Sequence, residues 1–468
     1  MTRSGPKWGL LKSLSRNRAG LFRVFAVLGL IASYPAATAI GNGTFEGVAS
    51  CAGSTCHGRA EGNGAVVRQD EIATWQEPSS PSGAHSRAYA VLEGQRGRQI
   101  IASLQGTPGI GRSAADSPAC LGCHTTPTNG APRGARFQIT DGVGCESCHG
   151  PAGGTWLSSH YARPATRASN VNDGLMPLES PQVRANVCLD CHYGSSKPGQ
   201  FVTHSMMAAG HPRVSFELDL FSALQQHHDI DADYTRRKGK PNAVRFWAVG
   251  QAEAVKRATS LFAQPKFGME GIFPQYYFLD CHSCHREIQD SNRRRLTFEE
   301  NPGRPIPFGN APFNDENIIM LSAVSSALVP GQADDFKRAS RAFHRAMGGE
   351  GDPRAAAVAL SQRAGQLSNS LSQRAYIDAD AFKVIGIIGD NATRPRFTDY
   401  SGSVQAVMAI DTLLNGLVTD GRVTPGAAAG IRASINRAYA AVEEPNKYKP
   451  DDFRAALASA VAAIRRLQ

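Results

Sequence analysis

The chain has 468 residues, which suggests two or three domains, with ten cysteines and a formal net charge of +10 at pH 7. Residues 1–39 carry six basic groups and no acidic ones, so the rest of the chain has a net charge of only +4. This small excess gives no argument for nucleic-acid binding, and no nucleic-acid-binding motif occurs in the sequence.

The first 39 residues have the pattern of a secretory signal peptide. Basic residues precede an apolar run from Val24 to Ser33, and the small residues of 37–39 follow it as a cleavage site. The run is too short to cross a bilayer, which takes about 20 residues. The alternative is an uncleaved amphipathic anchor. We therefore expect an exported, periplasmic protein with no membrane span after signal cleavage.

Five copies of one short motif use every cysteine of the chain. Four copies read Cys-x-x-Cys-His and begin at Cys120, Cys145, Cys188 and Cys281, whereas a stretched copy with four intervening residues begins at Cys51. Cys-x-x-Cys-His is the attachment site of c-type haem: the thiols bond to the haem vinyl groups and the histidine binds the iron. The predicted tethers for five haem c groups are Cys51, Cys56, Cys120, Cys123, Cys145, Cys148, Cys188, Cys191, Cys281 and Cys284. The predicted proximal iron ligands are His57, His124, His149, His192 and His285.

Other cysteine chemistry explains the pattern less well. Zinc sites do not require a histidine directly after each cysteine pair, and a thioredoxin-like site would need one motif, not four. For the stretched copy the alternative is a disulfide between Cys51 and Cys56. However, His57 and Gly58 follow the second cysteine as they would in a haem motif.

Eight further histidines supply candidates for the second axial ligand, which is usually His or Met in an electron-transfer haem. His204 and His211 are seven residues apart, nearly two helical turns, a spacing that suits ligands to two neighbouring haems. The favoured distal ligands are His85, His160, His204 and His211. The fifth haem either takes His227 or His228, or is five-coordinate and open to a small molecule. We expect structural roles for His282, His344, Met206 and Met207.

Residues 291–468 have no cysteine and are rich in alanine. Apolar residues spaced at helical intervals predict amphipathic helices there, and Pro425 and Pro450 open two of them. The predicted helices include 316–328, 334–347, 353–371 and 402–418. We expect a mainly α protein, with a haem-cored, loop-rich multihaem cytochrome domain at 40–290. The α-helical domain at 291–468 would be a helical bundle that packs on it or, alternatively, a docking platform for a redox partner.

Several segments within residues 45–290 resemble a family of multihaem c-type cytochromes that includes the tetrahaem electron acceptor of hydroxylamine oxidoreductase. These segments are Gly142–Pro151, Cys51–Gly58, His85–Tyr89, Cys120–His124 and Ala209–Arg213 with Phe216 and Glu217. The resemblance implies electron transfer through stacked pairs of bis-histidine haems, with distal ligands such as His85, His160, His204 and His211. The chain departs from that family in its five sites, one of them stretched, and in its helical tail.

Pentahaem nitrite reductases provide a second comparison. They use a haem site that ends in lysine, Cys-x-x-Cys-Lys, whereas all five motifs here end in histidine. We therefore predict an electron-transfer protein rather than an enzyme, which exchanges electrons with redox partner proteins. The alternatives are a reductase or oxidase of a small nitrogen or sulfur compound at one five-coordinate haem, and a structural filament bridged by haem.

Overall fold

The computed structural model describes residues 43–62, 68–162, 164–213, 216–265, 267, 269–270, 273–285, 303–305, 310–394 and 400–468. The predicted signal peptide at residues 1–39 lies outside these ranges. Residues Ile40–Gln468 form one compact unit. Among the described residues, no helix is long and apolar enough to cross a membrane.

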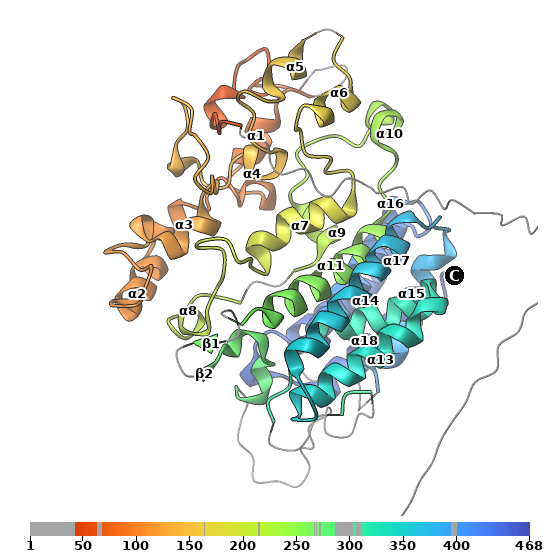
Figure 1. The fold of residues 1–468 in the computed structure, drawn as a ribbon. Coiled ribbons are helices and arrows are strands. Elements are labelled where there is room, and N and C mark those ends of the chain that lie inside the picture. Colours follow the sequence, from red (N-terminus) through yellow and green to blue (C-terminus); the bar gives the residue numbers. More distant parts are fainter. Residues whose placement is uncertain are drawn as a thin grey trace, which may run out of the picture. The chain divides into compact units, whose positions relative to one another are not determined.

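Short helices joined by turns and loops make up the part of the chain with the first four motifs (Figure 1, red to yellow-green). Its α-helices are α1 (Glu71–Gln76), α2 (Gln95–Leu104), α3 (Pro118–His124), α4 (Glu146–His149), α5 (Leu157–Tyr161), α6 (Arg167–Asn172), α7 (Pro181–His192), α8 (His204–Ala208), α9 (Leu218–Leu224) and α10 (Ala232–Lys238). Its 3-10 helices are η1 (Val48–Ser50), η2 (Pro81–Gly83), η3 (Ala90–Glu93), η4 (Ala114–Asp116) and η5 (Ile139–Asp141). Apart from the main core, one small cluster of buried side chains lies here, formed by Leu92, Ile101 and Ala114.

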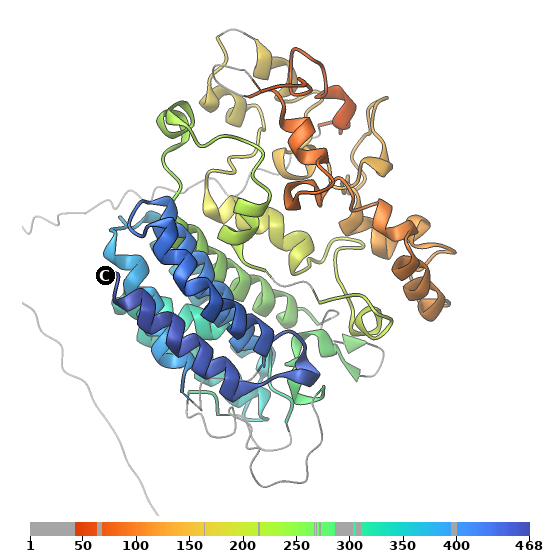
Figure 2. The same ribbon diagram turned by 180° about the vertical axis from the view of Figure 1, so that it is seen from behind.

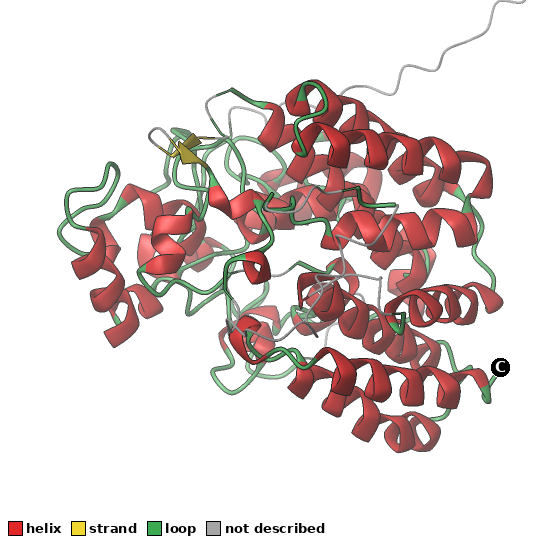
Figure 3. Ribbon diagram, turned by 90° about the horizontal axis from the view of Figure 1, so that it is seen from below, coloured by secondary structure: helices red, strands yellow, loops and turns green. Residues whose placement is uncertain are grey.

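Long helices form the rest of the molecule, and they run side by side in Figures 2 and 3. They are α11 (Ala243–Ala263), α12 (Glu316–Leu328), α13 (Pro330–Met347), α14 (Pro353–Gln373), α15 (Ala379–Ala392), α16 (Tyr400–Thr419), α17 (Pro425–Ala441) and α18 (Pro450–Arg465). The shorter elements are β1 (Met269–Glu270), β2 (Phe273–Pro274), η6 (Tyr276–Phe278), η7 (Cys281–Ser283) and η9 (Pro445–Lys447). The two strands pair antiparallel, with Met269 opposite Pro274.

Helix α11 is the central element of the core. The side chain of Asn242 caps its first turn by accepting a hydrogen bond from the backbone N–H of Arg245 (2.8 Å). Trp247 and its neighbours are fully buried, and the helix packs against α7, α9, α12, α14 and α16. A Cβ at Gly250 would lie 2.6 Å from the Cβ of Leu218, so glycine permits the close approach of α9.

One continuous apolar core joins α11 and the helices after it to the motif-bearing part of the chain. Ala185 and Leu189 of α7 are fully buried in this core, and α7 ends at the motif histidine His192. The core therefore fixes the orientation of the helix that presents the fourth motif. The division into domains at residue 290 stays a prediction.

The predicted mainly α fold is confirmed, and so are the helices predicted between residues 316 and 371, at 402–418, and from Pro425 and Pro450. Two of the long helices were not predicted, α11 and α15. His85 lies in a run of turns between η2 and η3, where the backbone N–H groups of Arg87 and Ala88 bond to the carbonyls of Ala84 and His85.

Candidate haem sites

We number the sites by chain order, so that the first contains His57 and the fifth His285. Each motif histidine faces a second histidine, with ring centres 6.0–6.4 Å apart. The pairs, in site order, are His57 with His160, His124 with His211, His149 with His227 and with His228, His192 with His85, and His285 with His204. The separations are 6.0, 6.2, 6.2, 6.1 and 6.4 Å.

This spacing is what one iron between two imidazoles requires. A metal–imidazole nitrogen bond is about 2 Å long and each ring centre lies about 1 Å beyond its nitrogen, which gives about 6 Å between centres. The predicted distal candidates His85, His160, His204 and His211 thus each lie opposite a different motif histidine. At the third site, ligand atoms of His149, His227 and His228 all lie within 4.8 Å of one another.

Helix ends position three of the motif histidines. His124, His149 and His192 are the last residues of α3, α4 and α7. At the third and fifth sites the N–H of the histidine bonds to the carbonyl of the first cysteine, at 2.9 and 2.8 Å. In the stretched copy the N–H of His57 makes the same bond to the carbonyl of Cys51, at 3.2 Å, despite two extra residues. The longer loop therefore closes in the same way as the ordinary motif.

The spacer residue Glu146 of the third motif also has a structural role. Its buried carboxylate accepts hydrogen bonds from the backbone N–H groups of Glu46 (3.0 Å), Gly47 (2.8 Å) and Ala152 (2.8 Å). It thereby ties the start of the described chain and the segment after the third motif to α4.

Four of the five sites open into one connected cavity of about 3080 Å³. The cysteines and histidines of the first four motifs line it, together with five of the facing histidines: His85, His160, His211, His227 and His228. A pocket for a single small molecule has about 300–1,000 Å³, so this cavity has room for several large flat ligands. His204 and His285 of the fifth site are not part of its lining.

Thiols of different motifs meet inside this region. None of the ten cysteines forms a disulfide, including Cys51 and Cys56. A hydrogen bond between the thiols of Cys51 and Cys145 lowers the pKa of the first and raises that of the second. A hydrogen bond with Cys123, followed by burial, raises the pKa of Cys191 well above its usual value.

Electrostatic interactions of Cys148 and Cys188 also connect the third and fourth motifs. Burial, and then the nearby Cys191, raises the pKa of Cys148 to about 11. Burial, and then the nearby Cys148, raises the pKa of Cys188 to about 12. Hydrogen bonds between thiols place the first site beside the third and the second beside the fourth, and the electrostatic influence of Cys148 and Cys191 on each other's motifs places the third near the fourth.

The imidazoles are held in a form that suits iron binding. Nδ1 of His124 lies 2.7 Å from the carbonyl oxygen of Ala88, and Nδ1 of His227 lies 2.8 Å from that of Gln225. A ring that donates from Nδ1 leaves the lone pair of Nε2 free for a metal. Burial lowers the pKa of His192 and of His227 to about 4, which keeps both rings neutral. The residues present therefore fit covalently attached, histidine-ligated haem.

The fifth site has different surroundings. The ring of Tyr276 lies 5.4 Å from that of His204. The guanidinium of Arg213 lies 3.3 Å from the Cys281 sulfur and 3.2 Å from a carboxylate oxygen of Glu316. His204 of this site begins α8, and His211, which faces His124 of the second site, lies just after the same helix. The fifth site is therefore near the second.

The remaining histidines are built into the packing. His282, 3% exposed, lies with its Nδ1 3.0 Å from the carbonyl oxygen of Pro445 and its ring against Tyr448. His344 is fully buried in α13, with Nε2 3.3 Å from a carboxylate oxygen of Asp315. Neither ring faces a motif histidine among the ring pairs of the described residues.

Residues 50–150 match the family model described as cytochrome c554 and c-prime. This segment includes the first three motifs. The match supports a c-type cytochrome, the class of protein that carries covalently bound haem and transfers electrons. No curated protein and no solved structure matches the chain. The more specific resemblance, to the electron acceptor of hydroxylamine oxidoreductase and its relatives, stays a prediction.

Sequence reasoning missed the polar side chains that support the sites. Glu71 lies 14 residues from His57, the ring it contacts, and nothing in its spacing marks it. Gln200 donates a hydrogen bond to the Gly122 carbonyl (3.2 Å) and lies 3.7 Å from the Cys191 sulfur. The sequence feature that could have pointed to Gln200 is its position after a glycine-containing loop that follows the fourth motif. Contacts that bridge two motifs are set by the fold and are not visible as a local pattern.

Proposed function

We propose that this protein is a pentahaem c-type cytochrome that transfers single electrons through five haems, each held between two histidines. The observation that carries the proposal is the pairing of every motif histidine with a second histidine at 6.0–6.4 Å. Ligation by two histidines gives lower potentials than ligation by histidine and methionine. The haem supplies the one-electron redox chemistry, and the chain supplies ligands, spacing and burial.

The contacts between motifs support one unbranched order of the sites. The thiol contacts connect the first site to the third, the third to the fourth and the fourth to the second. The fifth site adjoins the second, because His204 and His211 lie on and just after the same short helix, α8. We therefore propose a path in the order first, third, fourth, second and fifth.

The exposure of the cysteines supports the first and fifth sites as the two ends of this path. Cys56 of the first motif and Cys284 of the fifth are the exposed cysteines, whereas the other eight are partly buried. Electron donors and acceptors need access to the edge of a haem, and the ends of the proposed path are where the tethers are open to solvent. Redox partner proteins would therefore exchange electrons at the first and fifth sites of an exported, periplasmic protein.

Catalysis at an open haem has less support. A five-coordinate iron needs a motif histidine with no second ligand opposite it, and each of the five motif histidines faces another ring. The third site, with His227 and His228 both opposite His149, offers a surplus of ligands rather than a deficit.

The proposal is tested on the purified, matured holoprotein. We expect five haems per chain from the pyridine haemochrome assay combined with protein mass, and an electron paramagnetic resonance spectrum of low-spin ferric haem alone. A substoichiometric high-spin signal that shifts with cyanide or nitric oxide would favour the enzyme alternative. A colourless protein, or one without thioether links at these cysteines, would overturn the proposal.

A further inference from the structure

The first site has an acidic side chain against its motif histidine. A carboxylate oxygen of Glu71, the first residue of α1, lies 2.9 Å from Nδ1 of His57. Glu71 is 5% exposed, so its carboxylate is buried, whereas the His57 side chain is 29% exposed. The ring of His160 stacks on the other side of the site, 6.0 Å from His57 and inclined by 16°. Nδ1 of His57 points at the carboxylate, which leaves Nε2 for the iron.

The other motif histidines of the described chain have no such neighbour. Nδ1 of His124 meets a backbone carbonyl, that of Ala88. Nδ1 of His192 is buried without a hydrogen-bond partner. No ion pair joins His149 or His285 to a carboxylate within the part of the chain that the structure describes. The contact between His57 and Glu71 therefore distinguishes the first site from the others.

The carboxylate of Glu71 lies between two histidine rings. One of its oxygens is hydrogen-bonded to Nδ1 of His57 at 2.9 Å. The second oxygen is buried without a hydrogen-bond partner and lies 3.6 Å from Nδ1 of His228, a candidate ligand of the adjacent third site. This buried carboxylate therefore lies between two neighbouring haem sites and is hydrogen-bonded at the first.

We propose that Glu71 is a positioning residue that makes the first haem the lowest-potential haem of the path, by accepting a hydrogen bond from Nδ1 of His57. The inference rests on the proposed function. A carboxylate partner orients an imidazole ligand and makes it more basic. A more basic ligand and a nearby negative charge both favour ferric iron over ferrous iron, so the potential falls. The path then has its most strongly reducing haem at one exposed end.

The experiment is a spectroelectrochemical titration of the holoprotein and its Glu71→Gln variant. Loss of an outer-shell partner typically changes the energetics of a metal site tenfold to a hundredfold, which is about 59 to 118 mV for a one-electron couple. We expect the most negative of the five potentials to rise by that amount, the potential of the adjacent third haem to rise less, and the other three to move little. Glu77→Gln is the matched control, because this exposed residue follows α1 and contacts no histidine in the described chain.

The Glu71→Asp variant distinguishes an effect of the carboxylate charge from a purely structural role of the side chain. It keeps the negative charge but shortens the side chain, so we expect it to restore part of the shift in the same haem. If Glu71→Gln fails to load its first haem, Glu71→Asp carries the test alone: we expect a smaller rise confined to the lowest potential, and a rise spread equally over all five potentials would overturn the inference.

The inference and the proposed function fail in different ways. Fewer than five low-spin haems in the wild-type protein would contradict the proposed function. Five low-spin haems in both proteins, with the same five potentials, would contradict only the role of Glu71. A uniform shift of all five potentials would also overturn it, because that result would indicate a change in the whole molecule.

Discussion

His227 and His228 are adjacent in the chain, and both place an imidazole ring opposite His149. Both ring centres lie 6.2 Å from that of His149, and both rings are inclined to it by more than 80°. We therefore expect His227→Ala and His228→Ala each to keep five low-spin haems, because the remaining imidazole is within reach of the iron. The double variant should convert one haem in five to a high-spin form, measured by electron paramagnetic resonance.

The matched control for this pair is His85→Ala. His85 is the one histidine ring that faces His192 in the described chain, so its loss should by itself give one high-spin haem. A high-spin signal after either single substitution at 227 or 228 would instead identify that residue as the sole ligand of the third site.

Glu217 gives the molecule a pH-dependent stability. The residue is fully buried, and burial followed by repulsion from Asp219 raises its pKa from 4.5 to about 8. The folded state therefore binds this proton more tightly than the unfolded chain does. The stabilisation is fully present below about pH 4.5 and is lost as the pH rises through about 8. Each unit of pKa difference corresponds to about 1.36 kcal/mol.

We expect Glu217→Gln to flatten the fall in thermal stability between pH 5 and pH 8, because glutamine cannot ionise. Its one side-chain oxygen can accept from one of the two backbone N–H groups, those of Asp219 and Leu220, that Glu217 binds with separate oxygens. The measurement is the melting temperature by circular dichroism at several pH values. The exposed Glu350→Gln is the control, and equal slopes in both variants would contradict the prediction.

At the scale of single residues, the sequence predicted which histidines are candidate ligands better than it predicted which of them face each other. The Cys-x-x-Cys-His spacing marked the motif histidines, and the count of remaining histidines pointed to the facing ones. Which ring faces which depends on segments far apart in the chain, such as residues 85 and 192, and no local pattern carries that information. For the same reason, the contact of Glu71 with His57 could not be predicted.

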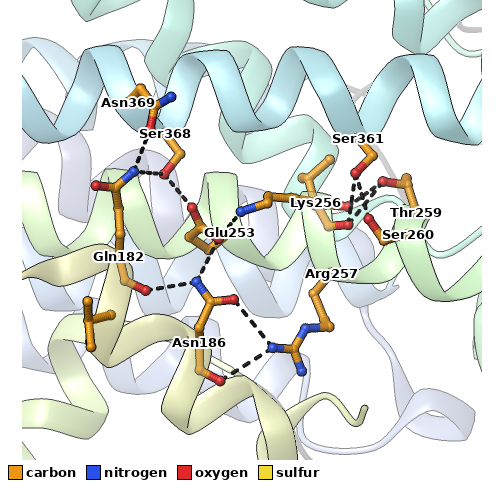
Figure 4. Close-up of polar contacts among 12 residues, drawn as sticks. Gln182, Asn186, Glu253, Lys256, Arg257, Thr259, Ser260, Ser361, Ser368 and Asn369 are labelled. Carbon is orange, nitrogen blue, oxygen red and sulfur yellow. Dashed lines mark hydrogen bonds and ion pairs between the residues drawn. The ribbon is translucent and has the colours of Figure 1, made fainter. Parts of the chain in front are cut away.

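Among the elements, α7, α11 and α14 are joined by a buried polar network around Glu253 (Figure 4). Its carboxylate, on α11, accepts hydrogen bonds from Ser368 of α14 (2.6 Å) and from Asn186 of α7 (2.9 Å). Gln182 of α7 also donates to Asn369 of α14 (2.8 Å). The network fixes α7, whose last turn carries the fourth motif, against the two longest helices.

We expect Glu253→Ala to destabilise the folded protein by about 1–3 kcal/mol, since it leaves buried donors on Asn186 and Ser368 without an acceptor. The measurement is unfolding by denaturant followed by circular dichroism. Lys256→Ala is the control, because its half-exposed ammonium group also contacts Glu253 but should contribute under about 1 kcal/mol. A stability equal to that of wild type in Glu253→Ala would contradict this account of the network.

The helices differ in how clearly the sequence predicts them. Helix α18 has an apolar stripe, from Phe453 to Ile464, that is buried as predicted. Helix α11 is buried on nearly all sides, so it has no polar face and no clear stripe to detect. Helix α15 contains Gly386 and Gly389, which weaken a helix signal. At Gly389 a Cβ would lie 2.7 Å from the side chain of Val461, so close packing with α18 accounts for one of these glycines.

For the whole molecule, the shared core predicts mutual dependence of the two parts of the chain. Residues from α7 and α11 are buried in the same apolar core as residues from α12 to α18. A chain that ends at residue 290 would expose those surfaces, so we expect it to be degraded or to aggregate, with less haem per chain than the full protein. Limited proteolysis and the haem-to-protein ratio measure this. A stable, monomeric product with all five haems would contradict the prediction and would support an independent domain at 40–290.

The fifth motif, at Cys281, comes late in the chain, yet it forms one open end of the proposed path. During synthesis it is the last of the motifs to leave the ribosome. A polypeptide that ends before this motif could carry four haems but would lack one exposed end of the proposed path. It could accept electrons at the first site without passing them on at the fifth. Attachment of haem at this last motif would then complete the route between the two exposed ends.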